Sequence, residues 1–243
     1  MLNICMKSGV IWTPGVDKPR RKDLTGHRQY RIIPSRFPPI NVLESLVSAD
    51  DLEVLYAIES LTNDRLQAEL GNLHLLPRTQ WVTGPGATVV MAAFTHIGNK
   101  SRFSNGDYGV YYAGLDEVTA IAETVFHNER RLRATGEPPI ELDMRVYVGT
   151  VQRKLEDLRP ARWQRYQQPA LSSWPAAQRF AAERRDDGCD GFVYRSARRD
   201  GGECVAAFVP GAVSLPRQGK HLRYAWDGEQ VSHVFSVGRL RRW

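Results

Sequence analysis

The sequence has few cysteines and no spacing typical of a metal site. Its 243 residues include three cysteines, Cys5, Cys189 and Cys204, with no CxxC pair and no paired histidines nearby. An odd and scattered set of this kind argues against a disulfide framework and against a zinc site. We therefore expect buried free thiols, a reducing compartment and no bound metal.

Long apolar runs and the common nucleotide-binding motifs are also missing. No segment approaches the roughly 18 apolar residues of a membrane span, and the first seven residues lack a secretory hydrophobic core. This pattern predicts a cytoplasmic protein with no membrane partner. The sequence contains no GxGxxG, GxxxxGK[ST], GxSxG or HExxH motif, which argues against a Rossmann fold, a P-loop, an α/β-hydrolase and a zinc protease.

The charge balance is mildly basic. Lys and Arg number 33 against 27 Asp and Glu, for a formal charge of +6. An excess of this size favours an anionic partner, such as a phosphorylated small molecule or an acidic protein. Because the basic residues are spread along the chain, direct nucleic-acid binding is not expected.

The pattern of apolar residues predicts one α+β domain. Residues 1–27 are polar and interrupted by prolines, which indicates an irregular lead-in, and residues 28–243 form the domain. Strand-like runs alternate with helical ones without a regular βαβ order, which favours a mixed β-sheet flanked by helices. The expected strands cover 30–33, 110–113, 142–151, 192–194, 204–209 and a hairpin at 221–235; the clearest helices cover 116–133 and 174–185.

The helix expected at 116–133 carries the candidate carboxylate Glu123. Asp116 stands at the N-cap, and Gly136 follows the last turn. At ~100° per residue Glu123 lies about 140° from Val118, beside the stripe expected to face the core. It can face a cleft there, or simply pair with Arg130 or His127. The expected stripe consists of Val118, Ile121, Ala122, Val125 and Phe126.

Four further residues are candidates for a site, although each also has an ordinary structural explanation. Arg31 ends an aromatic-led strand, Arg102 lies in a Gly/Asn-rich loop, Tyr112 lies in the following strand, and Ser196 follows a strand. Singly they are compatible with a strand-edge charge, loop solvation, core packing and a turn, in that order.

Taken together, these residues resemble the RES-domain family, and the resemblance spans roughly residues 28–215. The name of the family comes from its shared Arg, Glu and Ser. The spacing of Arg102, Tyr112 and Glu123, at intervals of 10 and 11 residues, makes the ordered set more specific than its parts. The matching pieces are YRI at 30–32, SRF at 101–103, VYYA at 110–113, TAIAE at 119–123, GFVYRS at 191–196 and GECVAAF at 202–208.

The resemblance implies a fold similar to the catalytic core of ADP-ribosylating toxins. It also implies a toxin of a bacterial toxin–antitoxin pair, whose Xre-like antitoxin covers the active site. RES-domain proteins consume NAD⁺, either by transferring ADP-ribose to a host protein or by hydrolysing or phosphorolysing the dinucleotide. The segment between Arg31 and Arg102 is longer than in the shortest members, which places transfer to a protein slightly ahead.

The residues suit that chemistry. Arg31 and Arg102 can grip the pyrophosphate of NAD⁺, since a guanidinium offers two parallel hydrogen bonds to phosphate. Tyr112 can stack on the flat nicotinamide. Glu123 can stabilise the oxocarbenium-like ribose, by analogy with glycoside hydrolysis. Ser196 can bind the carboxamide or orient Glu123, and no metal is required.

Two other classes of function compete with an NAD⁺-consuming enzyme. A non-enzymatic module can use its arginines to hold an acidic partner. A toxin that cuts RNA needs a His- or Lys-based acid–base pair beside a basic groove. The basic runs at 20–22, 130–133 and 184–185 support an RNA-cutting toxin only weakly, because each lies in a tail or at a helix end.

Overall fold

One sheet of nine strands organises the protein in a computed structural model, which describes residues 18–35, 48, 50 and 72–238. The strands follow the order β1-β5-β6-β7-β3-β2-β4-β8-β9, and only β5 and β6 are parallel. The sheet is therefore mixed, and the α+β prediction is confirmed. The strands are β1 (Arg21–Lys22), β2 (Arg28–Pro34), β3 (Tyr111–Gly114), β4 (Ile140–Thr150), β5 (Leu155–Asp157), β6 (Gly191–Arg195), β7 (Glu203–Ala207), β8 (Arg217–Trp226) and β9 (Val231–Val237).

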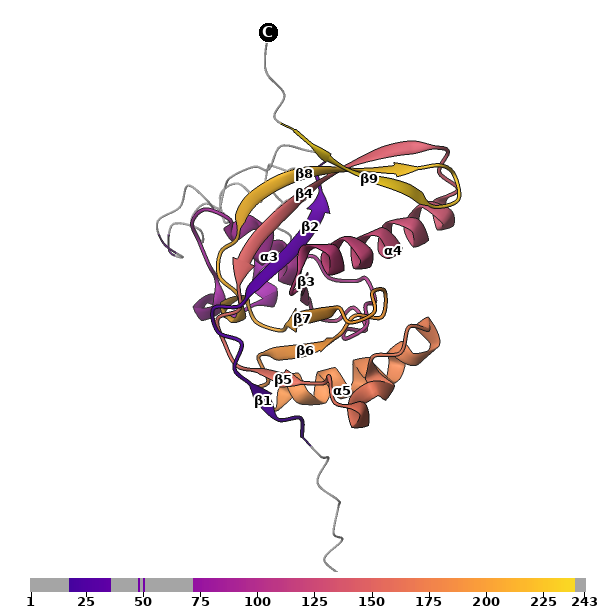
Figure 1. The fold of residues 1–243 in the computed structure, drawn as a ribbon. Coiled ribbons are helices and arrows are strands. Elements are labelled where there is room, and N and C mark those ends of the chain that lie inside the picture. Colours follow the sequence, from indigo (N-terminus) through magenta and orange to yellow (C-terminus); the bar gives the residue numbers. More distant parts are fainter. Residues whose placement is uncertain (1–17, 36–47, 49, 51–71, 239–243) are drawn as a thin grey trace, which may run out of the picture.

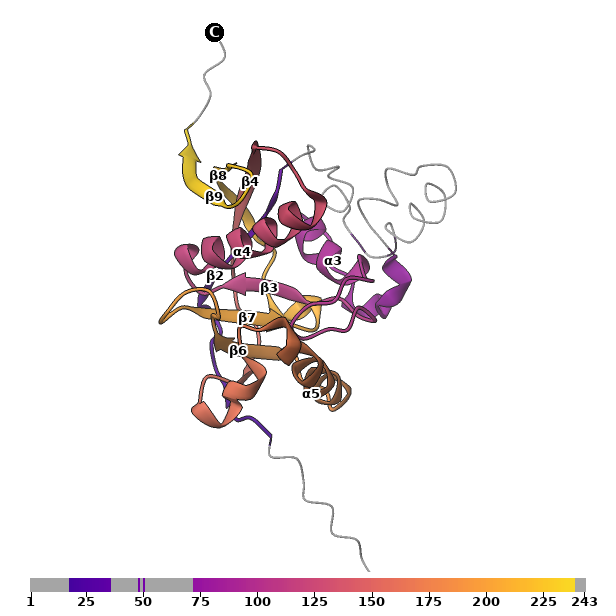
Figure 2. The same cartoon turned by 90° about the vertical axis from the view of Figure 1, so that its right-hand side faces the viewer.

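Within the described residues, three α-helices and five short 3-10 helices surround the sheet. In Figure 1, α4 runs beside β2, β4 and β8, and α5 runs beside β5 and β6. Figure 2 shows β3, β7 and β6 side by side between α4 and α5. No helix in the described part of the chain is long and apolar enough to cross a membrane. The helices are η1 (Leu73–Leu75), η2 (Arg78–Gln80), α3 (Ala87–Thr95), α4 (Glu117–Thr135), η3 (Ala161–Tyr166), η4 (Leu171–Ser173), α5 (Trp174–Asp186) and η5 (Pro210–Ala212).

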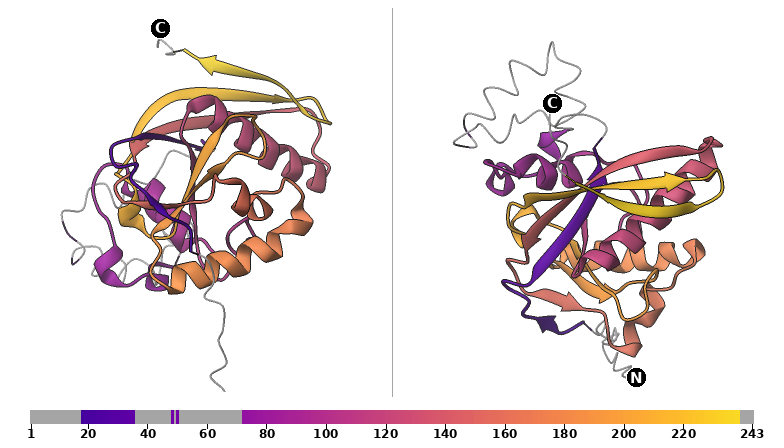
Figure 3. Two further views of the ribbon diagram at one scale, coloured as in Figure 1. Left: turned by 60° about the horizontal axis from the view of Figure 1, so that its bottom comes forward. Right: turned by 45° about the horizontal axis from the view of Figure 1, so that its top comes forward.

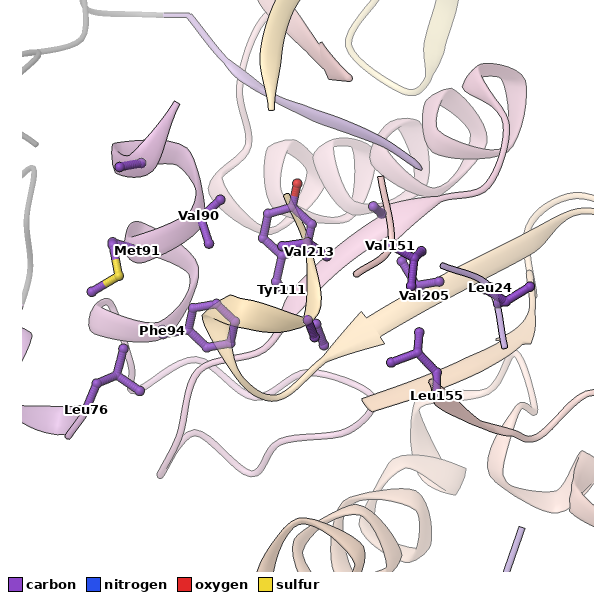
Figure 4. Packing of buried hydrophobic residues seen from close by; sticks show 14 of the residues in the cluster. Leu24, Leu76, Val90, Met91, Phe94, Tyr111, Val151, Leu155, Val205 and Val213 are labelled. Atoms are coloured by element: carbon purple, nitrogen blue, oxygen red, sulfur yellow. The ribbon is translucent and has the colours of Figure 1, made fainter. Parts of the chain in front are cut away.

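Different elements cover the two faces of the central strands. Tyr111 points to the face that α3 covers, where it packs with Phe94 and Val205 (Figure 4). Tyr112 points to the other face, beside a second cluster that joins α5 to β6 and β7. This alternation follows from the two-residue period of a strand. It places Tyr112 on the same side of the sheet as α5.

Helix α4 begins and ends where the sequence predicts. The Asp116 carboxylate accepts a hydrogen bond from the Thr119 N–H at 2.9 Å, and Gly136 ends the helix at φ 64°. Gly114 lets this helix approach β3 closely, because a Cβ there would lie 2.7 Å from the Ala120 nitrogen and 2.8 Å from the Asp116 oxygen. The start of α4 is thus held directly against the central strand.

The face that α4 turns inward differs from the prediction. Val118 is 58% exposed, and the other four members of the expected stripe are only half-buried. Ile121 and Val125 of the stripe do pack against the core cluster that includes Ile32, but the fully buried positions of the helix lie beside the stripe, so the prediction is only partly right. The buried residues of α4 are Thr119, Ala120, Asn128 and Leu132.

Several elements were not predicted. Residues 21–22 pair with β5 as β1, so the lead-in expected at 1–27 is not irregular throughout. β5 and the 3-10 helices of 160–173 are also new, because segments of three to six residues are too short to show a period. The hairpin expected at 221–235 is confirmed as β8 and β9, which extend along α4 (Figure 3). The preference for protein transfer depends on the segment between Arg31 and Arg102, of which residues 36–47, 49 and 51–71 lie outside the described residues.

Candidate active site

A cavity of about 310 Å³ lies between α4, the β2–β3 junction and the start of α5. Four of the five predicted site residues line it: Arg31, Arg102, Tyr112 and Glu123. They come from β2, a loop, β3 and α4, so the fold collects them from four separate segments. The other lining residues are Tyr30, Ile32, Lys100, Ser101, Ala113, Gly114, Ala120, Thr124, His127, Arg130, Trp174, Tyr194 and Cys204.

Arg31 occupies the point where β2 and β3 separate. The two strands form a single residue pair, Tyr30 with Gly114. Beyond it, Arg31 Nη1 donates to the Tyr112 carbonyl at 3.0 Å, and the guanidinium lies 4.5 Å from the centroid of the Tyr111 ring. Its Nε is buried without a hydrogen-bond partner in the described part of the chain, and burial lowers the pKa of this guanidinium. The positive charge of Arg31 is therefore held where β2 and β3 separate.

The Tyr112 hydroxyl holds the loop that precedes its own strand. It shares a hydrogen bond with the Ser101 hydroxyl at 2.9 Å and accepts one from the Phe103 N–H at 3.0 Å. Burial raises the pKa of Tyr112 to about 12, so the phenol stays protonated at neutral pH. Tyr112 both lines the cavity and packs beside Phe103, with ring centroids 6.4 Å apart.

Arg102 is more buried than a solvated loop residue would be. It is 8% exposed, and its Nη1 donates to the Gln168 carbonyl at 2.6 Å. In the same loop, Gln178 of α5 donates from Nε2 to the Ser101 carbonyl at 2.7 Å. These two bonds tie the loop to α5 and to the turn that precedes η4, so the Arg102 guanidinium is fixed in the cavity wall.

Glu123 lies beside the inward face of α4, and Ser196 orients its carboxylate. Ser196 Oγ donates to Glu123 Oε1 at 2.6 Å and accepts hydrogen bonds from the N–H groups of Arg198 and Arg199 at 3.1 Å. Cys204 Sγ is a weaker neighbour at 3.9 Å. Glu123 forms no ion pair with a described basic residue, so the pairing with Arg130 or His127 that the sequence left open is absent there.

Ser196 acts on the carboxylate and does not line the cavity. Of its two predicted roles, the geometry favours orienting Glu123 over binding a carboxamide. The serine belongs to the turn after β6, and that turn fixes the hydroxyl through two backbone N–H groups. Ser196 is therefore both a turn residue and a site residue.

Several cavity residues were not identified from the sequence, among them Lys100, Arg130 and Trp174. From the sequence, Arg130 is a cation near the end of α4 and a candidate partner of Glu123, and Trp174 is the start of a helix. Helical spacing puts Arg130 seven residues, about two turns, after Glu123, which was a usable signal. No local pattern indicates that Trp174 approaches the same cavity.

The cysteines that the structure describes are buried free thiols, as predicted. Burial raises the pKa of Cys189 to about 12 and that of Cys204 well above its ordinary value. Neither is therefore ionised at neutral pH. Cys5 lies outside the described residues, and within residues 18–35, 48, 50 and 72–238 no group of His, Cys, Asp or Glu side chains is arranged to hold a metal.

The fold and the site define an α+β domain with a basic cavity built around one oriented carboxylate. The family model of the RES domain matches residues 75–227, and the chain belongs to this family. Arg102, Tyr112, Glu123 and Ser196 fall within the match, whereas Arg31 precedes it. The expected extent of 28–215 is therefore covered by the family model only from residue 75 onward.

Similar proteins include a curated bacterial sequence and a solved structure. The uncharacterized protein y4oC of Sinorhizobium fredii is 32% identical over 210 residues, which cover 85% of this chain and 86% of that protein. A chain in the crystal structure of the M. tuberculosis MbcT–MbcA toxin–antitoxin complex is 11% identical, with a TM-score of 0.40 and coverage of 87% of both chains.

Proposed function

We propose that this protein is the toxin of a toxin–antitoxin pair and that it cleaves the nicotinamide–ribose bond of NAD⁺. The observation that supports this most is the Glu123 carboxylate, held at 2.6 Å by Ser196 in the wall of a basic cavity. A carboxylate fixed in advance stabilises positive charge that develops only in the transition state. That is the requirement for breaking an N-glycosidic bond.

The four predicted residues that line the cavity each have a role in the proposed reaction. Arg31 and Arg102 supply positive charge for the pyrophosphate, and Tyr112 packs against the nicotinamide ring. As the C1′–N bond breaks, its electron pair leaves with nicotinamide, and the ribose becomes oxocarbenium-like beside Glu123. An acceptor oxygen or nitrogen then bonds to C1′ and loses its proton.

We propose that the acceptor is a side chain of a host protein, so that the reaction is ADP-ribosyl transfer. Water and inorganic phosphate are the other acceptors, and they would give NAD⁺ depletion without a protein target. We also propose that an Xre-like antitoxin covers the cavity near Arg31 and Arg102, because a free NAD⁺ consumer would harm the cell that makes it. An antitoxin complex that keeps full activity contradicts this second proposal.

The test is incubation of the purified chain with NAD⁺, with and without cell extract. We expect release of nicotinamide, and a fall of about 100- to 1,000-fold for Glu123→Gln, as for the loss of one stabilising group in other active sites. Glu117→Gln is the matched control, since Glu117 lies on the same helix and pairs with Lys220 at 2.6 Å outside the cavity.

The form of the product identifies the acceptor. Label from the adenine moiety retained on a protein indicates transfer, free ADP-ribose indicates hydrolysis, and a phosphorylated ADP-ribose indicates phosphorolysis. NAD⁺ that stays intact with the wild-type chain, with and without extract, refutes the proposed enzyme.

A further inference from the structure

Arg130 and Trp174 form a stacked pair at the side of the cavity where α4 and α5 meet. The Arg130 guanidinium lies 5.3 Å from the centroid of the Trp174 ring. Both residues line the cavity, together with Lys100. A guanidinium stacked on an indole keeps its N–H groups free at its edge, because the ring contacts only its flat face. The pair is therefore a preformed donor of hydrogen bonds.

The Trp174 indole has a polar group without a partner. The residue is only 6% exposed, and its Nε1–H is buried with no hydrogen-bond partner among the described residues. A buried donor left unpaired costs about 1–3 kcal/mol. The ring lines the cavity, so a small rotation of the ring would bring this enclosed donor to an acceptor atom of a bound ligand. Trp174 is also the first residue of α5, so the positive end of that helix lies at the same wall.

The charges in the cavity indicate which kind of ligand group accepts these hydrogen bonds. Four basic side chains line it, and Glu123 is its one carboxylate. Arg31 and Arg102 each use Nη1 to bind a backbone carbonyl. Lys100 and Arg130 form no ion pair or hydrogen bond with the described residues, so their charges are uncompensated. An uncompensated ammonium, a guanidinium and a neutral N–H donor together suit a phosphoryl group.

We propose that Arg130, Trp174 and Lys100 form a subsite for a phosphoryl group. Within the proposed function, on which this inference rests, the group is the pyrophosphate of the dinucleotide. Arg130 and Lys100 bind its charge, and the Trp174 N–H binds one oxygen. Arg31, which is fixed where β2 and β3 separate, then attracts the phosphoryl group through its charge more than by direct contact. Inorganic phosphate has the same chemistry, so the experiment separates the two ligands.

The test uses ADP, which carries a pyrophosphate and no nicotinamide, and the purified full chain. Calorimetric titration measures the Kd of ADP, and separately that of inorganic phosphate, for the wild type, Arg130→Gln and Trp174→Phe. Steady-state kinetics measure KM and kcat for NAD⁺. We expect Arg130→Gln to raise both Kd and KM about tenfold, and Trp174→Phe severalfold, with little change in kcat. Arg131→Gln is the matched control, because Arg131 is the next residue and lies outside this cavity.

The outcomes separate this inference from the proposed function. A Kd for ADP that stays within twofold of wild type in both variants, or no ADP binding by the wild type, overturns the subsite. ADP binding that depends on Arg130 in a chain that leaves NAD⁺ intact keeps the subsite and refutes the enzyme. An effect on the Kd of inorganic phosphate alone assigns the subsite to free phosphate. Arg130 is exposed, so its variant folds even where Trp174→Phe does not.

Discussion

Replacing Ser196 by Ala tests whether the turn after β6 positions the carboxylate of Glu123. The hydroxyl donates to Glu123 Oε1 at 2.6 Å and accepts from the N–H groups of Arg198 and Arg199 at 3.1 Å. The alanine variant removes all three bonds and leaves a carboxylate that is free to rotate. Because Ser196 does not line the cavity, the substitution changes no wall of the binding site.

The size of the effect follows from the kind of bond that is lost. A hydrogen bond to a charged group contributes about 1.5–3 kcal/mol, and each 1.4 kcal/mol is a tenfold change. We therefore expect kcat for NAD⁺ cleavage to fall about 10- to 100-fold, less than for Glu123→Gln. Ser196 is half-buried, so water can replace its bonds to the backbone, and the free energy of unfolding should fall by only about 1 kcal/mol.

The assay combines nicotinamide release with urea unfolding. Ser196→Thr, which retains the hydroxyl, should recover most of the lost kcat, whereas a merely structural role would not distinguish Thr from Ala at equal stability. Ser232→Ala is the control, because its hydroxyl binds a backbone carbonyl on the distant β8–β9 hairpin. The positioning argument is refuted if kcat of Ser196→Ala stays within twofold of wild type.

Two further predictions concern stability. Arg184 and Glu156 form a buried ion pair in which both residues are at most 5% exposed, so Arg184→Met should cost about 3–5 kcal/mol in urea unfolding. A second change, Glu156→Leu, should restore part of the loss, and no recovery would contradict this account. Burial raises the pKa of Tyr112 from 10.0 to about 12, which favours the protonated phenol in the folded state. This contribution to stability is present below pH 10 and disappears as the pH rises towards 12. The difference in free energy of unfolding between the wild type and Tyr112→Phe should therefore shrink by roughly 2 kcal/mol over this range. A difference that stays constant with pH would refute this.

Much of the secondary structure could be predicted because it depends on neighbours along the chain. Asp116 and Gly136 set the ends of α4, since a cap and a left-handed residue act within one turn. The hairpin of β8 and β9 turns at Asp227, whose carboxylate accepts from the N–H groups of Glu229 and Gln230. Short elements such as β5 were missed, because pairing with β6 stabilises them and no local pattern does.

Most of the candidate site could also be predicted, but only as a set of separate residues. Arg31, Arg102, Tyr112 and Glu123 were identified by type, spacing and resemblance, and the structure brings all four to one cavity. Their individual roles depend on contacts between distant segments. The bond from Arg31 to the Tyr112 carbonyl exists because two strands separate at that point, which nothing near Arg31 in the sequence indicates.

The sequence by itself determined the types of side chain, the ends of α4 and the α+β class, because capping, periodicity and spacing act locally. Only the tertiary structure decided which face of α4 turns inward, since Val118 is exposed while Thr119 and Ala120 are buried. It also decided that α5 brings Trp174 to Arg130. Such contacts depend on how whole elements pack, and burial of the common core, not local preference, sets that packing.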